Sequence, residues 1–403
     1  MTDDRRPKAE AAKGHFYRRL DRLEGQYEQM AEQAADRERT LARLRSDLRR
    51  YQRQPLIRFV RAVRDKIRRI LPPGAEHGRP APGQVTGPRV SRGPDGQPTI
   101  AIHIAAPTAA AGASWGDTPF AEALRSAFEA RGWVGTIHTQ DDWESPTSAG
   151  ADVALHLFGV RVPPVLPGQV SLLWVISHPD RLTARRCETY DAVFVASDSF
   201  RDDLAERIAT PVHVLHQATD PDRFFPDRTG PHHELLFVGG SRKGRRPIVE
   251  AASRTGHDLA VYGGNWTPDL LDPRHLRGEW IANDELRRYY SSADIVLNDT
   301  WRDMREEGFI SNRVFDALAC GAFVLSDRVP GMDETFDRSV ATYEREDEIA
   351  AIIEDALTHP AERRARAELG RAAVLGRHTF AHRVDTIVAT LKGRLDHRDQ
   401  GTS

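Results

Sequence analysis

The stretch DIVLNDTWRDMREEGFISNRVFDALACGAFVLSD, residues 294–327, decides the fold that this sequence predicts. Residues 295–297 form an apolar strand, a polar loop follows, and residues 312–319 have the spacing of an amphipathic helix. Gly321 ends that helix, and residues 322–325 form a second strand. This order predicts part of a parallel α/β unit. The backbone N–H groups at the start of the helix are free and suit a phosphate.

The same alternation of strands and helices extends to both sides of this stretch. The predicted strands are 100–105, 134–138, 153–158, 171–176, 192–196 and 212–215, and then 235–238, 259–262, 295–297, 323–325 and 340–343. Helical segments such as 120–130, 200–208 and 247–253 lie between them, and a long helical stretch, 361–395, ends the series. Apolar strands separated by helices indicate parallel sheets covered on both faces. We therefore expect two Rossmann-like domains, 99–225 and 226–375, facing a cleft, with a helix and tail at 376–403.

A heptad pattern covers residues 15–53. One heptad position holds Leu20, Tyr27, Ala34, Leu41 and Leu48, and the other holds Leu23, Met30, Arg37, Leu44 and Tyr51. This spacing predicts an α-helical coiled coil, and with it a homo-oligomer. A single amphipathic helix packed on its own chain is the alternative.

A second, strongly basic helix is expected at 56–71. Residues 1–71 hold 20 Lys/Arg against 11 Asp/Glu in a chain whose net charge is −2. The basic amphipathic face suits an anionic membrane surface, and the alternative is a helix that docks on protein. Residues 72–98 contain seven prolines and six glycines, which predicts a linker.

Composition bounds the remaining classes of protein. The chain has 403 residues, 39% of them hydrophobic, and a mean hydropathy of −0.54. Its two cysteines, Cys187 and Cys320, lack metal-ligand spacing and read as reduced thiols. No signal peptide or membrane-spanning run is visible, so we expect a cytoplasmic protein whose membrane contact, if any, is peripheral.

The segment GFISNRVFDALACGAFVLSD, residues 308–327, resembles the donor-binding segment of retaining nucleotide-sugar glycosyltransferases of the group 1, or family 4, type. It is most similar to the branch of the spore-maturation-type glycosyltransferases, of which Asn312-Arg313 is typical. The resemblance implies a GT-B fold whose last helix returns toward the N-terminal domain. It also implies that Asp316 binds the donor ribose, while Ser311, Asn312 and Arg313 meet the diphosphate.

The sequence departs from the resembled family at one acid. That family carries two acids eight residues apart, and an ungapped alignment on residues 319–321 places the second on Asp316 and the first on Gly308. Glu306 and Glu307 stand just before Gly308, out of register. We place Glu307 near the transferred sugar.

A glycine-rich basic loop follows the strand at 235–238 in the sequence LLFVGGSRKGRRP, residues 235–247. Gly239 and Gly240 allow the backbone to approach a ligand closely. The four cations that follow, Arg242, Lys243, Arg245 and Arg246, can neutralise a diphosphate. The resemblance implies that an Arg and a Lys of this loop bind the donor, and we select Lys243 and Arg246. A solvated basic loop is the alternative.

Two loops of the first domain carry the candidate catalytic residues. Trp115, Gly116 and Asp117 precede the helix at 120–130. We expect Trp115 and Gly116 near the acceptor, and Asp117 is either catalytic or only a helix cap. His178 follows the strand at 171–176, where the resemblance implies contact with the transferred sugar and a structural histidine is the alternative.

Asn298 and Trp301 follow the strand before the donor helix and are expected to line the base or sugar pocket. No strand ends in a DxD pair, so we expect no metal and no cofactor apart from the nucleotide-sugar co-substrate.

These residues predict a metal-independent glycosyltransferase that acts on a glycan, lipid-linked or protein acceptor. The resemblance implies retention of configuration and a role in cell-surface polysaccharide or glycoconjugate synthesis. Two alternatives stay open: a nucleotide-sugar epimerase, and a non-catalytic assembly protein that acts through its coiled coil. Nucleic-acid binding is not expected because no aromatic-basic motif is present.

Overall fold

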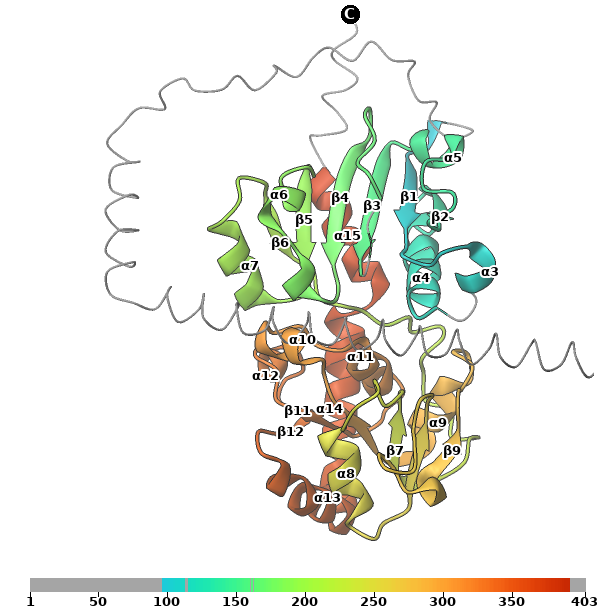
Figure 1. Ribbon diagram of the computed structural model, residues 1–403, viewed down its shortest axis with the longest axis vertical. Coiled ribbons are helices and arrows are strands. Elements are labelled where there is room, and N and C mark those ends of the chain that lie inside the picture. The colour runs from blue at the N-terminus through green and yellow to red at the C-terminus, as the bar shows by residue number, and fades with distance from the viewer. Residues whose placement is uncertain (1–95, 113–114, 160, 162, 392–403) are drawn as a thin grey trace, which may run out of the picture. The chain divides into compact units, whose positions relative to one another are not determined.

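The computed structural model describes residues 96–391 except 113–114, 160 and 162 (Figure 1). The expected coiled coil, the basic helix and nearly all of the linker lie outside the described residues and stay predictions. The described part contains two six-stranded sheets, and every strand pair in both is parallel. The two parallel α/β sheets expected from the sequence are therefore confirmed.

The first sheet has the strand order β2-β1-β3-β4-β5-β6. Its strands are β1 (Thr99–His103), β2 (Val134–His138), β3 (Val153–Phe158), β4 (Val170–Val175), β5 (Ala192–Val195) and β6 (Val212–Val214). Side chains alternate between its two faces. Leu172 and Trp174 of β4 pack with α4 (Asp117–Glu129) and α15 (Phe380–Leu391), whereas Leu173 and Val175 pack with α6 (Ala184–Cys187) and α7 (Asp198–Ala205).

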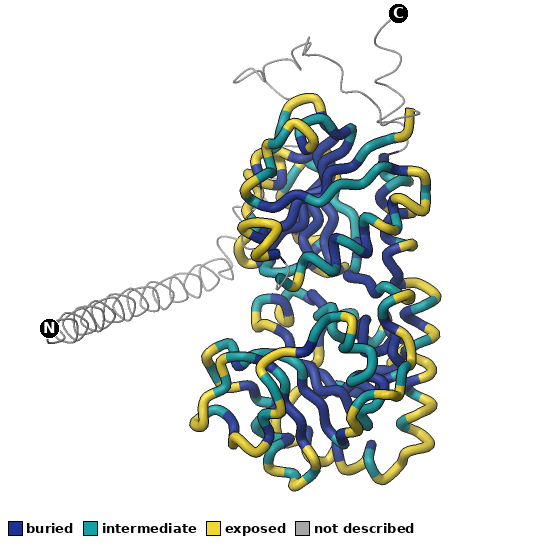
Figure 2. Tube along the Cα trace, turned by 90° about the vertical axis from the view of Figure 1, so that its right-hand side faces the viewer, coloured by how far each residue is buried: buried dark blue, intermediate teal, exposed yellow. Residues whose placement is uncertain are grey.

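The second sheet has the order β12-β11-β10-β7-β8-β9. Its strands are β7 (His233–Val238), β8 (Leu259–Tyr262), β9 (Leu276–Gly278), β10 (Ala293–Asn298), β11 (Val324–Asp327) and β12 (Ala341–Tyr343). One face is covered by α9 (Leu286–Ser292), α11 (Asn312–Ala319), α12 (Met332–Thr335) and α14 (Pro360–Arg377), the other by α8 (Pro247–Ser253) and α13 (Ile349–Thr358). Figure 2 shows buried segments in the interior and exposed segments at the surface.

Three short features differ from the sequence-based expectations. The loop before α11 contains a five-residue helix, α10 (Arg302–Glu306), and β9 was not anticipated. Both are too short to show periodicity in sequence. The expected single helical stretch at 361–395 is divided into α14 and α15 at His378 and Thr379. Other short elements are α3 (Ala109–Gly112), α5 (Pro146–Ala149), η2 (Pro179–Arg181), η3 (Pro273–His275) and η4 (Glu346–Glu348).

The chain passes between the two sheets twice, near Thr219 and again at the division between α14 and α15. Thr219 N–H donates to the carbonyl oxygen of His378 at 3.0 Å, and Phe380 N–H donates to that of Thr219 at 3.2 Å. α15 then packs on the first sheet. The two crossings are therefore joined by backbone hydrogen bonds.

A buried arginine holds the same two crossings together. Arg383 of α15 is 6% exposed and donates to the carbonyl oxygens of His216 at 2.7 Å and Gln217 at 2.9 Å. It also donates to the Arg377 carbonyl at 3.0 Å and hydrogen-bonds to His378 Nδ1 at 2.7 Å. Burial lowers the pKa of Arg383 to about 10, which leaves the guanidinium charged at neutral pH.

Both cysteines are buried and unpaired. Among the described helices, none combines the length and apolar character needed to span a membrane.

Candidate functional site

The carboxyl ends of β7, β10 and β11 bring three loops to one edge of the second sheet. The glycine-rich loop follows β7, Asn298 ends β10, and Asp327 ends β11. α11 begins beside them, with Ser311 as its N-cap. Among the described residues, the Ser311 side chain makes no capping hydrogen bond. The N–H of Val314 donates to the Ser311 carbonyl oxygen at 3.0 Å, so the N–H groups of Asn312 and Arg313 are the ones that suit an anion.

Three arginines lie around the carboxyl ends of these strands. The guanidinium of Arg242 stacks 4.0 Å above the ring of Trp301, and Arg313 Nη1 donates to Asn298 Oδ1 at 2.8 Å. Arg246 forms a two-pronged ion pair with Asp299. Asp299 therefore balances the charge of Arg246. Arg242 and Arg313 are the less compensated cations of the group.

The pKa of Arg242 is lowered by burial and by this excess of positive charge. Burial first, and then the positive charges of Arg246 and Arg313, lower the pKa of Arg242 to about 10 against the opposing effect of Asp299. The guanidinium is charged at neutral pH but lies in a site with excess positive charge. A bound diphosphate would relieve that repulsion, since an opposite charge nearby favours the ionised form.

The structure corrects the expected role of Arg246. It is only 4% exposed, and besides Asp299 it donates to the carbonyl oxygen of Gly240 at 2.8 Å. Arg246 therefore supports the backbone of the glycine-rich loop from the protein interior and does not face a ligand. Lys243, the other selected cation, is exposed. Sequence could not rank the four cations because their burial depends on the position of Asp299 in the fold.

Gly239 and Gly240 are needed for close packing of two loops. A Cβ on Gly240 would lie 2.9 Å from the carbonyl oxygen of Gly264, and one on Gly239 would lie 2.9 Å from Arg313 Nη2. The next two residues, Arg242 and Lys243, have positive φ angles of 57° and 56°. Successive left-handed residues cost strain that is common at ligand-binding loops.

The first domain contributes a chain of contacts toward Trp301. Trp115 Nε1 donates to Asp117 Oδ2 at 3.1 Å. Burial raises the pKa of Asp117, which the Trp115 hydrogen bond and the charge of His178 partly oppose. The His178 ring lies 5.9 Å from that of Trp301. Asp117 thus interacts electrostatically with His178, whose ring lies near the Trp301 ring on which Arg242 stacks, although the four residues come from separate segments.

The alternative reading of Asp117 as a helix cap is wrong. The N-cap of α4 is Gly116, Asp117 is the first helical residue, and no side chain caps the helix. Its carboxylate points to Trp115 instead.

His178, Asp180 and Asp303 form a group with metal-ligand chemistry, which was not anticipated from sequence. One ligand atom from each lies within 4.8 Å of the others. His178 Nδ1 is 3.6 Å from Asp303 Oδ2, which ties η2 of the first domain to α10. Asp180 follows His178 by two residues, but only the fold places Asp303 beside them.

Asp316 lies in a separate, small cavity. It is buried, and it accepts hydrogen bonds from Thr219 Oγ1 and Asn312 Nδ2, both at 2.8 Å. The cavity has a volume of about 40 Å³, and Gly116, Asn312 and Asp316 are among its lining residues. Three residues selected from the sequence therefore meet there.

The pKa of Asp316 leads to a prediction about stability. Burial raises the pKa from 3.8 to about 8, against hydrogen bonds from Thr219 and Asn312. Between these two values the unfolded chain has released the proton and the folded chain retains it, so stability falls as pH rises. We expect Asp316→Asn to become more stable than the native protein as pH increases from 5 to 8, by up to about 1.4 kcal/mol per pH unit.

Urea unfolding at several pH values checks this expectation. Asn312 Oδ1 has no hydrogen-bond partner among the described residues, so an Asn312 amide rotated by about 180° would accept a hydrogen bond from the new asparagine. Asp222→Asn, at an exposed acid, is the matched control. Parallel pH curves for Asp316→Asn and the native chain would mean that Asp316 is ionised in the folded protein.

The structure explains why a glycine occupies position 308, where the resembled family has its first acid. Its φ is +78°, and a Cβ there would lie 2.7 Å from Ser197 Oγ. The neighbouring Glu307 carbonyl accepts a hydrogen bond from Ser197 Oγ at 2.6 Å. An acid at position 308 would therefore require this contact between the domains to rearrange.

The expectation that Asn298 lines the base or sugar pocket is also corrected. Its side chain is fully buried, donates to Ser326 Oγ at 2.9 Å and accepts from Arg313. It supports Arg313 and does not line an open pocket.

Comparison with known proteins agrees with this architecture. Residues 242–389 match a family described as "Glycosyl transferase-like". A search of curated proteins finds no match. Among solved structures, sucrose-phosphate synthase from Thermosynechococcus elongatus is similar at 16% identity and a TM-score of 0.52, over 76% of this chain and 100% of that one. Anabaena HepE in complex with UDP-glucose is similar at 10% identity and a TM-score of 0.54, over 73% and 99%.

A third similar structure is an alpha-glucosyltransferase in complex with UDP-glucose and DNA, at 10% identity and a TM-score of 0.55, over 73% of this chain and 99% of that one. At such identities the similarity establishes the fold. The GT-B fold expected from the sequence is thus confirmed. Together with the family match, it supports a glycosyltransferase of the GT-B type. The spore-maturation branch stays a prediction.

Proposed function

We propose that this protein transfers a sugar from a nucleotide-sugar donor to a glycan, lipid-linked or protein acceptor, with retention of configuration. One observation carries the proposal: Arg242, Arg313 and the uncapped start of α11 gather at one sheet edge, and Asp117 and His178 of the other domain approach them through Trp301. An excess of positive charge next to groups with proton-transfer chemistry suits a reaction whose leaving group is a diphosphate.

Each part of the donor has a proposed partner in this arrangement. The diphosphate meets Arg242, Arg313, Lys243 and the first turn of α11, while Asp316 binds the ribose hydroxyls. The acceptor enters near Trp115 and Gly116. The bond between the anomeric carbon and the phosphate oxygen breaks, its electron pair leaves with the diphosphate, and the acceptor oxygen bonds to that carbon. The acceptor proton passes to the leaving phosphate or to a nearby base.

The UDP-glucose bound in two of the similar structures suggests which donor to try first. The full-length protein is titrated with UDP, GDP, ADP and TDP and with their sugars, by calorimetry. Asp316→Asn is titrated alongside. We expect micromolar binding of one nucleotide and a loss of tenfold or more in the variant, even though the variant is the more stable protein at pH 8. Acceptor-dependent transfer of the sugar distinguishes a transferase from an epimerase, which changes the sugar without an acceptor.

We expect transfer to be independent of metal. Arg242, Arg313 and a helix N-terminus can stabilise the leaving diphosphate by themselves. Activity should be unchanged in EDTA and in Asp180→Asn. Loss of activity in EDTA that Mg²⁺ or Mn²⁺ restores would contradict this, and a matching loss in Asp180→Asn would assign the metal to His178, Asp180 and Asp303.

A second candidate function is favoured by Gly308. The close approach of Ser197 Oγ leaves no room for the acid that contacts the donor sugar in the resembled family. A non-catalytic GT-B-like protein that acts through residues 15–53 would fit this observation. Absence of nucleotide binding by the well-folded protein, together with self-association that is lost on removal of residues 15–53, would favour it.

Residues 56–71 are proposed to bind an anionic membrane surface. Vesicle binding that survives their removal would contradict that assignment.

A further inference from the structure

A second charged cavity lies at the opposite edge of the second sheet from the proposed donor site. Its volume is about 240 Å³. His232 directly precedes β7, and Ala293 and Asp294 begin β10. Because these strands are parallel, the cavity lies at their amino ends, whereas Arg242 and Arg313 lie near the carboxyl ends. A ligand bound here would not share the donor site.

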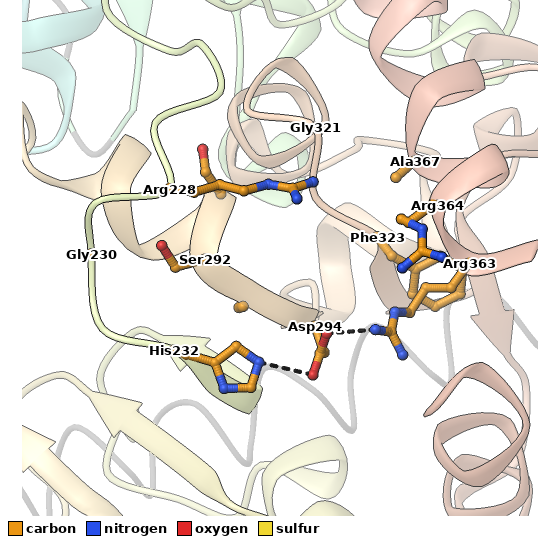
Figure 3. A pocket seen from close by; sticks show the side chains of 12 residues that line it. Arg228, Gly230, His232, Ser292, Asp294, Gly321, Phe323, Arg363, Arg364 and Ala367 are labelled. Atoms are coloured by element: carbon orange, nitrogen blue, oxygen red, sulfur yellow. Dashed lines mark hydrogen bonds and ion pairs between the residues drawn. The ribbon is translucent and has the colours of Figure 1, made fainter. Parts of the chain in front are cut away.

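Cationic side chains dominate the lining of this cavity. Arg228 reaches it from the loop before β7, and Arg363 and Arg364 reach it from α14 on the other side, as Figure 3 shows. His232 also lines it, and Asp294 is the single acid among its lining residues. Even with His232 neutral, three guanidinium groups face one carboxylate.

The carboxylate of Asp294 is already engaged. Arg363 Nη2 donates to Asp294 Oδ1, and His232 Nε2 lies 3.1 Å from Asp294 Oδ2. These contacts use both oxygens and fix Arg363 in the cavity wall (Figure 3). Asp294 therefore balances Arg363 and leaves the other arginines uncompensated.

Arg228 and Arg364 carry the remaining positive charge. Neither side chain has a hydrogen bond or ion pair with any residue in the described part of the chain. Two guanidinium groups that line one cavity without a shared anion repel each other, and an anion between them would be attracted to both. Their planar, forked donors match the oxygens of a phosphate.

We propose that this cavity binds a phosphate group, with Arg228 and Arg364 as its direct ligands and Arg363 held beside them by Asp294. The group belongs either to a soluble phosphorylated compound or to the headgroup of an anionic lipid. The two sources share the chemistry that the cavity recognises, and an experiment distinguishes them.

Pyrophosphate is the first probe. The full-length protein is titrated at constant ionic strength with an excess of UDP, so that the proposed donor site does not account for the signal. The double variant Arg228→Gln/Arg364→Gln is compared with Arg254→Gln/Arg274→Gln, which removes two exposed arginines of the same domain outside the cavity. We expect at least tenfold weaker pyrophosphate binding in the first variant and no change in the second.

Vesicles of phosphatidylglycerol and phosphatidylcholine form the second arm. A lipid source predicts that Arg228→Gln/Arg364→Gln reduces sedimentation with these vesicles more than the control pair does. A soluble source predicts weaker pyrophosphate binding with unchanged sedimentation. If the two double variants behave alike with both probes while remaining folded, the proposal is wrong.

Discussion

Arg242→Gln should lower the efficiency of sugar transfer by about 10²–10³-fold, which corresponds to roughly 3–4 kcal/mol of lost transition-state stabilisation. Arg242 is only partly compensated, because the Asp299 carboxylate, which lies 3.9 Å from it, is already paired with Arg246. Its stacking on Trp301 holds it in place without neutralising it. Negative charge develops on the leaving diphosphate, so an unbalanced guanidinium there acts most strongly in the transition state.

The same loop supplies the control for this experiment. Arg245 is exposed and already paired with Glu250 and Glu346, so Arg245→Gln should change transfer by less than about threefold. Nucleoside diphosphate affinity and kcat/KM are measured for both variants, with circular dichroism to verify folding. Equal effects of the two substitutions would remove Arg242 from the proposed diphosphate site.

Arg383→Ala should destabilise the fold by about 3–5 kcal/mol, because it removes a buried cation and leaves the carbonyl groups of His216, Gln217 and Arg377 without their donor. Lysine should not restore stability, since one ammonium cannot reproduce the geometry of the guanidinium fork. Because Arg383 joins both chain crossings between the sheets, the two domains should also lose their cooperative unfolding. Urea denaturation monitored by circular dichroism tests both statements.

Arg131, which follows α4 and contacts α15, provides a matched comparison. It bridges α4 to α15 through Asp385 and the carbonyl oxygen of Ala381, but its partner Asp385 is largely exposed. Arg131→Ala should therefore cost less than about 1 kcal/mol. A similar loss for Arg131→Ala and Arg383→Ala would mean that burial does not set the contribution of Arg383.

Much of the fold follows from local sequence. The bounds of α11 and α8, and of β2, β3 and β8, agree with the expected segments, because each is long enough to show its period or its apolar run. The strands that differ do so by a few residues at their ends, where boundaries depend on the partner strand. α10 and β9 escaped detection because three to five residues carry no period.

The candidate site was predicted less completely. Sequence located the basic loop but selected Arg246, whose burial against Asp299 depends on residues more than fifty positions apart. It placed Asn298 in a pocket, whereas Ser326 and Arg313 enclose it. Asp303 could not be linked to His178 before the fold joined η2 to α10.

The sequence by itself determined the two series of parallel strands, the helix that follows Ser311 and the supply of cations near residues 239–246. These properties depend on hydrophobic period and residue chemistry, which are local. Only the tertiary structure decided which cations remain uncompensated, that an acid at position 308 would crowd Ser197, and that Arg228 and Arg364 line one cavity. Those properties depend on distances between segments far apart in the chain, and burial and charge compensation act through such distances.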